Sequence, residues 1–149
     1  MIIGSWNIRG LNEPYKQDEV RSWVRVNRIF LFGLNETRVR PSSGSRITRS
    51  LMRGWKSINN YNHHSNGRIW ILWDPSVVDI DMIYSTSQVI HVTVLLIQKQ
   101  ISFQVSFIYG LNSYTERLPL WRCIRQTARV MDSPWMLIGD FNAVRYPSE

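Results

Sequence analysis

Residues 135–142 read Trp-Met-Leu-Ile-Gly-Asp-Phe-Asn, an apolar run that ends at a glycine followed by a carboxylate and an amide. Ser133 and Pro134 precede this run and break the segment before it, so residues 135–138 are predicted to form a short buried strand. Asp140 and Asn142 follow that strand directly. A charge placed there is expected at the edge of a sheet, which makes Asp140 the strongest candidate for a functional residue in the chain.

The same arrangement occurs at three earlier places. Apolar runs at 2–6, 29–34 and 103–109 each end at polar residues, which are Asn7, Glu36, and Tyr109 together with Asn112. Helices are predicted after the first and third runs, from about residue 12 and from 114 to 131. Each strand–helix–strand unit is expected to be right-handed with parallel strands. The carboxyl ends of these strands therefore share one edge of the sheet, where ligands usually bind.

The segments between these motifs give a coarser prediction. Residues 41–53, rich in Ser, Gly and Arg, are expected to form a loop with at most one helical turn. Asn12 is a possible cap for the first helix, and the runs between 69 and 109 are expected to be antiparallel hairpin neighbours. The apolar helix faces are predicted from spacing. They comprise Val20, Trp23, Val24 and Val26 in the first helix, and Leu118, Leu120, Trp121, Ile124 and Ala128 in the last.

Length and composition limit the class of protein. The 149 residues suit one domain spanning 1–149, and the formal net charge is +7, with only three lysines among the eighteen basic residues. An arginine-rich chain favours a polyanionic partner, nucleic acid ahead of membrane, although ordinary surface charge stays open as an explanation. The single Cys123 excludes an internal disulfide, and no apolar run approaches the ~20 residues of a membrane span. An intracellular protein without membrane attachment is expected.

Two carboxylates and several amides at one sheet edge suit a hard divalent cation. Mg²⁺ prefers oxygen ligands and needs only one or two carboxylates besides a substrate phosphate. Glu36 is predicted to hold the metal and Asn7 to orient it, while Asp140 orients or deprotonates an attacking water. Asn142 would polarise the phosphate, and Tyr109 and Asn112 would bind its oxygens. The alternative for each residue is structural: a turn cap, a solvated carboxylate or a packed aromatic ring.

Four motifs in order carry a resemblance to a known family. They are Ser5-Trp6-Asn7-Ile8-Arg9-Gly10, Leu34-Asn35-Glu36-Thr37-Arg38, Tyr109-Gly110-Leu111-Asn112 and Gly139-Asp140-Phe141-Asn142. Together they resemble the endonuclease/exonuclease/phosphatase superfamily over essentially the whole chain. Residues 67–73 and Pro134-Trp135 resemble one subgroup in particular, the endonuclease domains of plant LINE-type (non-LTR) retroelements.

The resemblance implies a fold, a reaction and a site. The fold is a four-layer α/β sandwich of the DNase I-like type, in which two packed mixed β-sheets are flanked by helices. The reaction is Mg²⁺- or Mn²⁺-dependent hydrolysis of phosphodiester bonds in DNA by water attack, in a monomeric and nuclear protein. By analogy Asn7 and Glu36 belong to the metal site, and Asp140, Asn142 and Tyr109 are catalytic. Asn112 and Arg117 would contact the phosphate or the nucleic acid.

The chain also departs from the family pattern. Members continue past the Gly-Asp-Phe-Asn strand and add an asparagine-bearing segment, a late aspartate and a late Asp-His pair. Here the sequence ends at Glu149, and His63, His64 and His91 match none of those places. The resemblance therefore implies the N-terminal portion of the domain, with the second half incomplete, poorly soluble and inactive by itself. The alternatives are a small-phosphoester phosphatase of the same superfamily and a non-catalytic nucleic-acid-binding remnant.

Overall fold

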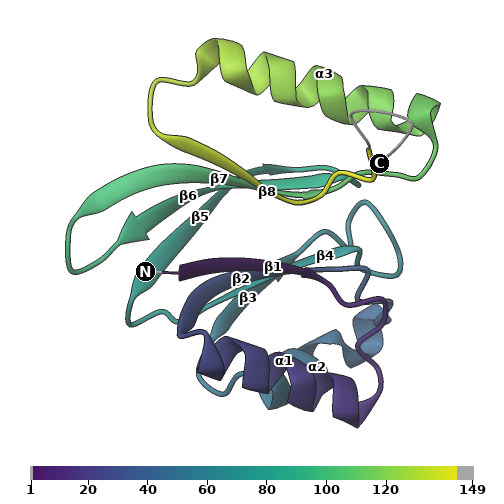
Figure 1. The fold of residues 1–149 in the computed structure, drawn as a ribbon, viewed down its shortest axis with the longest axis vertical. Coiled ribbons are helices and arrows are strands. Elements are labelled where there is room, and N and C mark those ends of the chain that lie inside the picture. Colours follow the sequence, from purple (N-terminus) through teal and green to yellow (C-terminus); the bar gives the residue numbers. More distant parts are fainter. Residues whose placement is uncertain (1, 144–149) are drawn as a thin grey trace.

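The computed structural model describes residues 2–143. Two four-stranded sheets face each other, with α1 and α2 outside the first sheet and α3 outside the second, which gives four layers (Figure 1). This confirms the predicted four-layer α/β sandwich. In chain order the elements are β1 (Ile2–Asn7), α1 (Pro14–Val26), β2 (Ile29–Asn35), α2 (Pro41–Leu51), β3 (Lys56–Asn59), β4 (Ile69–Trp73), β5 (Val78–Ser85), β6 (Val89–Leu96), β7 (Ile101–Tyr109), α3 (Tyr114–Val130) and β8 (Trp135–Asp140).

Both sheets mix parallel and antiparallel pairs. The strand orders are β1-β2-β4-β3 and β5-β6-β7-β8. The parallel pairs are β1 with β2 and β7 with β8, the two pairs joined through a helix, and the remaining pairs are antiparallel. The expectation that residues 69–109 form consecutive hairpin neighbours is wrong for β4, which pairs with β2 and β3. Its five residues are all buried, as expected for a central strand covered on both faces.

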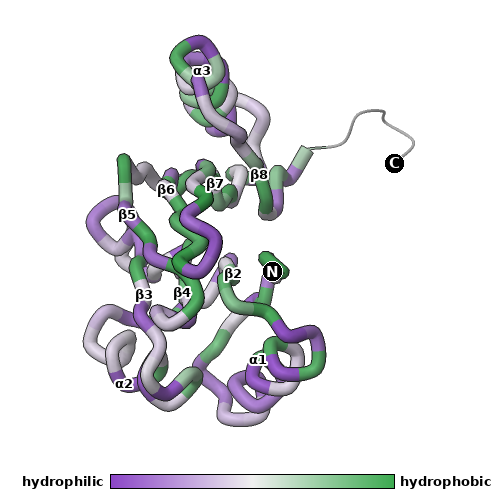
Figure 2. Tube along the Cα trace, turned by 90° about the vertical axis from the view of Figure 1, so that its left-hand side faces the viewer, coloured by the Kyte–Doolittle hydropathy of each residue, from purple (hydrophilic) through white to green (hydrophobic). Residues whose placement is uncertain are grey.

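The core lies in three layers: one on the helix side of the first sheet, one between the two sheets, and a smaller one between the second sheet and α3. Phe32 and Leu72 face the helices α1 and α2, whereas Leu31 and Ile71 face the second sheet. In Figure 2 the strands carry long hydrophobic stretches, while hydrophilic and hydrophobic residues alternate along the helices. The sheets approach closely because Gly33 has no side chain: a Cβ there would lie 2.4 Å from the Phe107 ring. This packing fixes the relative position of the two strand pairs that carry the site.

Residues 41–53 were expected to form a loop but contain the eleven-residue helix α2. Gly44, Ile47 and Leu51 are buried at spacings of three and four, and Pro41 occupies the first turn, where its missing N–H costs nothing. The poor helix propensity of Ser and Gly is outweighed by burial of this face, because tertiary packing overrides propensity. Because the helix contains two large apolar residues, Ile47 and Leu51, its periodic signal in the sequence is sparse.

The faces of the other helices also differ in part from expectation. Asn12 does not cap α1; its side-chain amide donates to the Arg38 carbonyl at 3.0 Å. Val26 is 75% exposed, and on α3 Leu118 is exposed whereas Thr127 is buried; Ala128, also expected to face inward, is exposed. Within residues 2–143 no helix combines the length and the apolarity that crossing a membrane requires.

Candidate active site

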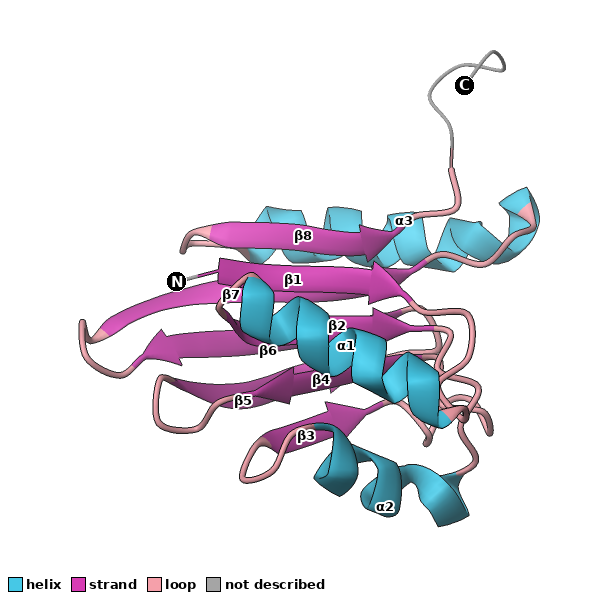
Figure 3. Cartoon of the chain, turned by 60° about the horizontal axis from the view of Figure 1, so that its bottom comes forward, coloured by secondary structure: helices cyan, strands magenta, loops and turns pink. Residues whose placement is uncertain are grey.

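Four strand ends meet at one edge of the molecule. Asn7 is the last residue of β1, Glu36 follows β2, Tyr109 is the last residue of β7, and Asp140 is the last of β8. The register pairs Asn7 with Asn35 in the first sheet and Tyr109 with Asp140 in the second. Because β1, β2, β7 and β8 run in the same direction, their carboxyl ends lie on the same side (Figure 3). Both parallel units thus deliver polar side chains to a common edge, as the sequence predicts.

Hydrogen bonds join these side chains across the two sheets. The Asn7 Nδ2 donates to Glu36 Oε1 at 3.0 Å and to Asp140 Oδ2 at 2.7 Å. The Tyr109 hydroxyl donates to the same Glu36 oxygen at 3.0 Å. The predicted gathering of these residues around one place is therefore present, with Asn7 as the bridge between the two carboxylates.

The loop after β8 holds Asp140 in position. The backbone N–H of Asn142 donates to Asp140 Oδ1 at 2.9 Å, and the Asn142 side chain donates to the Gly110 carbonyl at 2.6 Å. Gly139 has a φ of +140°, and a Cβ at this residue would lie 2.0 Å from the Ile108 carbonyl oxygen. The glycine before the aspartate is thus required by close backbone approach, and Asn142 ties the loop to the end of β7.

The Glu36 carboxyl lies in an electropositive setting. Burial raises the pKa of Glu36, but the hydrogen bonds from Asn7, Arg38 and Tyr109 and the charge of Arg38 outweigh it, so that its pKa lies below the ordinary value. The Arg38 guanidinium donates to Glu36 Oε2 at 2.8 Å. Burial and the neighbouring Glu36 raise the pKa of Tyr109. At neutral pH the site therefore contains an ionised carboxylate and a protonated phenol.

Asn112 lies in the connection between β7 and α3, and Arg117 lies in the first turn of α3. Asn112 is exposed. The Arg117 Nη1 donates to the carbonyls of Leu111 and Asn112 at 2.7 and 2.6 Å, so the guanidinium shapes the loop that carries Asn112. Their predicted contact with a phosphate stays a prediction.

A second group of residues borders Glu36 and was not identified from the sequence. Arg38, His64, Asn66 and Arg68 line a pocket of about 240 Å³ together with Glu36 and Tyr109. The Arg68 guanidinium lies 5.6 Å from the centre of the Tyr109 ring. Burial, with a smaller contribution from the charge of Arg68, lowers the pKa of His64. Arg38 and Arg68 lie within sequence motifs quoted above, but their spacing in the sequence does not predict that they border Glu36.

The donors at this edge fit a hard cation better than a transition metal. Among residues 2–143 no group of three or more His, Cys, Asp or Glu side chains gathers. Asn7 Oδ1 is buried and has no hydrogen-bond partner in this part of the chain, so its lone pairs are free to bind a cation. Two carboxylates and one amide oxygen match the preference of Mg²⁺, which retains water and takes further oxygens from a phosphate.

Space for such a phosphate lies next to Asp140. A pocket of about 790 Å³ is bordered by Ser5, Asn7 and residues 138–143, where β1 and β8 run beside each other.

Residues 4–147 match the Endonuclease/Exonuclease/phosphatase family. The chain belongs to this family. Members of the Endonuclease/Exonuclease/phosphatase family are hydrolases that act on phosphoester bonds. No curated protein matches the chain in sequence.

Several solved structures share the fold of this chain. A mannosyl-6-phosphatase of Bacteroides thetaiotaomicron VPI-5482 superposes with a TM-score of 0.71 at 11% identity, covering 98% of this chain and 67% of that one. The endonuclease domain of TRAS1, a telomere-specific non-LTR retrotransposon, gives 0.66 at 12% identity, with 94% and 58% covered. D. rerio TDP2 in complex with a single-strand DNA product gives 0.64 at 15% identity, with 94% and 60% covered. The chain thus spans about two thirds or less of each.

Proposed function

We propose that this edge is the metal-dependent phosphodiesterase site of a DNA endonuclease of the plant LINE-type retroelement kind. The observation that carries the proposal is the pair of carboxylates, Glu36 and Asp140, joined through the Asn7 amide and flanked by Tyr109. Two carboxylates beside a protonated hydroxyl supply what phosphodiester hydrolysis needs. One carboxylate binds the metal, the other accepts a proton from the attacking water, and the hydroxyl donates a hydrogen bond to the phosphate.

Glu36 and the Asn7 Oδ1 are the residues that would hold Mg²⁺ or Mn²⁺. Glu36 is suited to this because its lowered pKa keeps the carboxylate ionised. Asn7 Oδ1 is suited because it is buried without another partner among the described residues. A divalent cation bound here would polarise the phosphoryl oxygens and neutralise charge on them.

The remaining residues position water and phosphate. Asp140 is held through both oxygens, by Asn7 and by the Asn142 N–H, so it is fixed to accept a proton from an attacking water. Tyr109 keeps its proton and can donate to a phosphate oxygen. Asn142 positions Asp140 by closing the loop after β8. We infer that Asn112 and Arg117 contact the neighbouring phosphate.

The charges around the site favour DNA over a small phosphoester. Arg38, Arg68 and His64 line one pocket together with Glu36, whereas Asp140 lines a separate pocket. A substrate with several phosphates can use both pockets, whereas a single phosphate occupies one. The net charge of +7 acts in the same direction, because a cationic protein binds DNA through release of counterions.

We expect slow turnover from these residues alone. No histidine borders the pocket at Asp140 in the part of the chain that the structure describes, and His91 is buried inside the second sheet. Removing one member of a catalytic group that acts as a unit lowers the rate by orders of magnitude.

The test is nicking of supercoiled plasmid by the full chain in Mg²⁺, with EDTA as the metal-free comparison. Weak nicking is expected that EDTA, Asp140→Ala and Glu36→Gln each abolish, while Asp79→Ala, at an exposed carboxylate of β5, retains it. Calorimetric Mg²⁺ binding should weaken in Glu36→Gln. Nicking that survives Asp140→Ala, or hydrolysis of p-nitrophenyl phosphate without nicking, would overturn the proposal, the latter in favour of a phosphatase. Salt-sensitive DNA binding without cleavage would indicate a binding remnant.

A further inference from the structure

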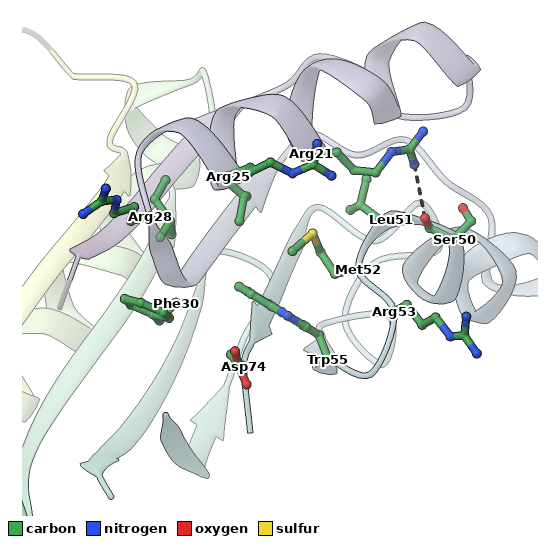
Figure 4. A pocket seen from close by; sticks show the side chains of 12 residues that line it. Arg21, Arg25, Arg28, Phe30, Ser50, Leu51, Met52, Arg53, Trp55 and Asp74 are labelled. Carbon is green, nitrogen blue, oxygen red and sulfur yellow. Dashed lines mark hydrogen bonds between the residues drawn. The ribbon is translucent and has the colours of Figure 1, made fainter. Parts of the chain in front are cut away.

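A third cavity lies at the opposite end of the strands of the first sheet. It has a volume of about 490 Å³ and lies between the C-terminal ends of α1 and α2 and the start of β2 (Figure 4). Ile29 at the start of β2 borders it, whereas Glu36 follows the end of that strand. Seven residues of extended chain separate the two places, a distance of about 20 Å. The cavity is therefore distinct from the proposed active site.

The floor of this cavity is apolar and its rim is cationic. Phe30, Met52 and Trp55 are partly buried in the floor, above the buried Val24, Ile29 and Leu51. The rim carries four arginines from three separate segments, which are Arg21 and Arg25 of α1, Arg28 between α1 and β2, and Arg53 between α2 and β3. In Figure 4 Arg21 reaches across to Ser50 of α2, and Arg28 and Arg53 lie at the two ends of the cavity.

Most of this positive charge has no partner within the described residues. The ion pairs in residues 2–143 are Arg21 with Asp18 and Arg38 with Glu36, so Arg25, Arg28 and Arg53 are unpaired. One acid, Asp74, lines the cavity, and its Oδ1 accepts hydrogen bonds from Ser76. The C-terminal ends of α1 and α2 add about half a negative charge each. A net charge of about +1 remains for a ligand to neutralise.

The apolar, aromatic floor and the cationic rim together limit the class of ligand that this cavity can bind. A free inorganic anion would leave the aromatic floor uncovered, and an apolar peptide would bury arginines without partners. A nucleotide satisfies both, because its base is planar and stacks on aromatic side chains while guanidinium groups bind phosphate oxygens bidentately. The volume lies within the range of about 300–1,000 Å³ usual for ligand pockets.

We propose that this cavity binds a nucleotide, with the base against Phe30, Met52 and Trp55 and the phosphates on Arg25 and Arg28. The nucleotide is either free or one unit of a nucleic-acid strand, since both present the same base and phosphate. Asp74 is placed to accept a hydrogen bond from an amino or hydroxyl group of the ligand. The site does not depend on the proposed hydrolysis, because it uses none of the residues assigned to that reaction.

The experiment is calorimetric titration of the full chain in EDTA at low salt with ATP, adenosine, inorganic triphosphate and an eight-residue oligodeoxythymidine. ATP is expected to bind saturably, with adenosine and triphosphate at least tenfold weaker. The double variant Arg25→Glu/Arg28→Glu should weaken binding at least tenfold. The control Arg46→Glu/Arg49→Glu makes the same charge change on exposed residues of α2 outside the cavity and should stay within twofold.

Two further variants separate this site from the other and test its floor. Asp140→Ala should leave the affinity unchanged, and Trp55→Leu, checked for folding by circular dichroism, should weaken binding while all arginines remain. Binding of the oligonucleotide in place of ATP, with the same dependence on Arg25 and Arg28, supports the proposal and identifies a strand as the source. Absence of saturable binding of either, equal loss in both arginine pairs, or loss in Asp140→Ala overturns it. Failure of plasmid nicking leaves these outcomes unaffected.

Discussion

At the scale of single residues, Asn7 determines how the site is assembled. It stands at the end of an edge strand of one sheet, yet its amide donates to carboxylates carried by both sheets. A neutral donor between two negative groups offsets their repulsion without adding charge. An asparagine here therefore allows Glu36 and Asp140 to stay close when no cation is bound.

The variant Asn7→Asp tests this role. It removes both donated hydrogen bonds and brings a third carboxylate to the pair, so in EDTA the free energy of unfolding should fall by about 2 kcal/mol or more. Mg²⁺ should restore most of the loss, because a cation that binds the folded chain alone stabilises it. Chemical denaturation with and without Mg²⁺ measures both effects.

Asn62→Asp is the matched control, since Asn62 is exposed in the turn before β4. It should lose little stability in EDTA and respond to Mg²⁺ as the wild type does. A stabilisation of Asn7→Asp by Mg²⁺ no larger than that of the wild type would contradict the assignment of this edge as a cation site.

The polar residues of the site could be predicted from the sequence because they follow apolar runs, and parallel crossovers bring strand ends together. Their partners could not. Arg38 lies two residues after Glu36, but its pairing depends on left-handed backbone at both residues, with φ of +54° and +53°. Arg68 and His64 reach the site from the turn before β4, and sequence spacing carries no signal for that approach.

At the scale of elements, the β7–β8 pair depends on a glycine. A Cβ at Gly139 would lie 2.0 Å from the Ile108 carbonyl oxygen, a backbone atom that cannot move aside, in a conformation with a φ of +140°. Gly139→Ala should lower the free energy of unfolding by about 3 kcal/mol or more and displace Asp140. Gly10→Ala is the comparison, because Gly10 also has a positive φ but open space around it. Its cost should be about 1–2 kcal/mol, and equal costs would refute the steric explanation.

The second sheet contains a buried histidine that should make stability depend on pH. His91 lies 2% exposed on β6 between Ser106 and Gln104 of β7, and burial lowers its pKa below the ordinary value of 6.5 despite the opposing hydrogen bond with Gln104. Protonation therefore favours the unfolded chain. The stability that neutral His91 provides is complete above pH 6.5 and is lost as the pH falls from there through the lowered pKa.

Denaturation midpoints between pH 7 and pH 5 measure this effect. His91→Gln should flatten the decline of stability in that window, although the variant starts from a lower value because a buried ring is lost. His64→Gln should remove a smaller part, because the His64 ring is less buried and its pKa is lowered as well. An unchanged decline in His91→Gln would show that other groups set the pH dependence.

Elements were predictable where the apolar pattern was dense. β1, β2 and α3 lie close to their expected bounds, because their apolar residues follow strand or helix periodicity. α2 was missed because burial of Gly44, Ile47 and Leu51, which depends on its neighbours, outweighs weak propensity. The assignment of β4 to the first sheet depends likewise on long-range pairing, since its short apolar run fits either sheet.

At the scale of the whole molecule, each sheet has, in the described part of the chain, one edge strand that carries charged side chains and one that is uncharged up to its last residue. β3 is four residues long and carries Lys56, and β5 carries the exposed Asp79 and Asp81. Charges and short length are the usual means by which edge strands avoid pairing with other chains. β1 and β8, which pair on one side only within residues 2–143, are uncharged from Ile2 to Asn7 and from Trp135 to Gly139. The unprotected edges are thus the two that lie beside each other at the site.

Concentration-dependent association through these two edges follows from that contrast. Met136 on β8 is 43% exposed, so Met136→Lys places a charge on the unprotected edge and should reduce association, measured as weight-average mass by sedimentation velocity over a range of protein concentrations. Met82 on β5 is 46% exposed and directly follows Asp81 on an edge that is already charged. Met82→Lys makes the same substitution at similar exposure and should change association little. Equal effects of the two substitutions would mean that general solubility, rather than pairing at β8, controls association of the chain.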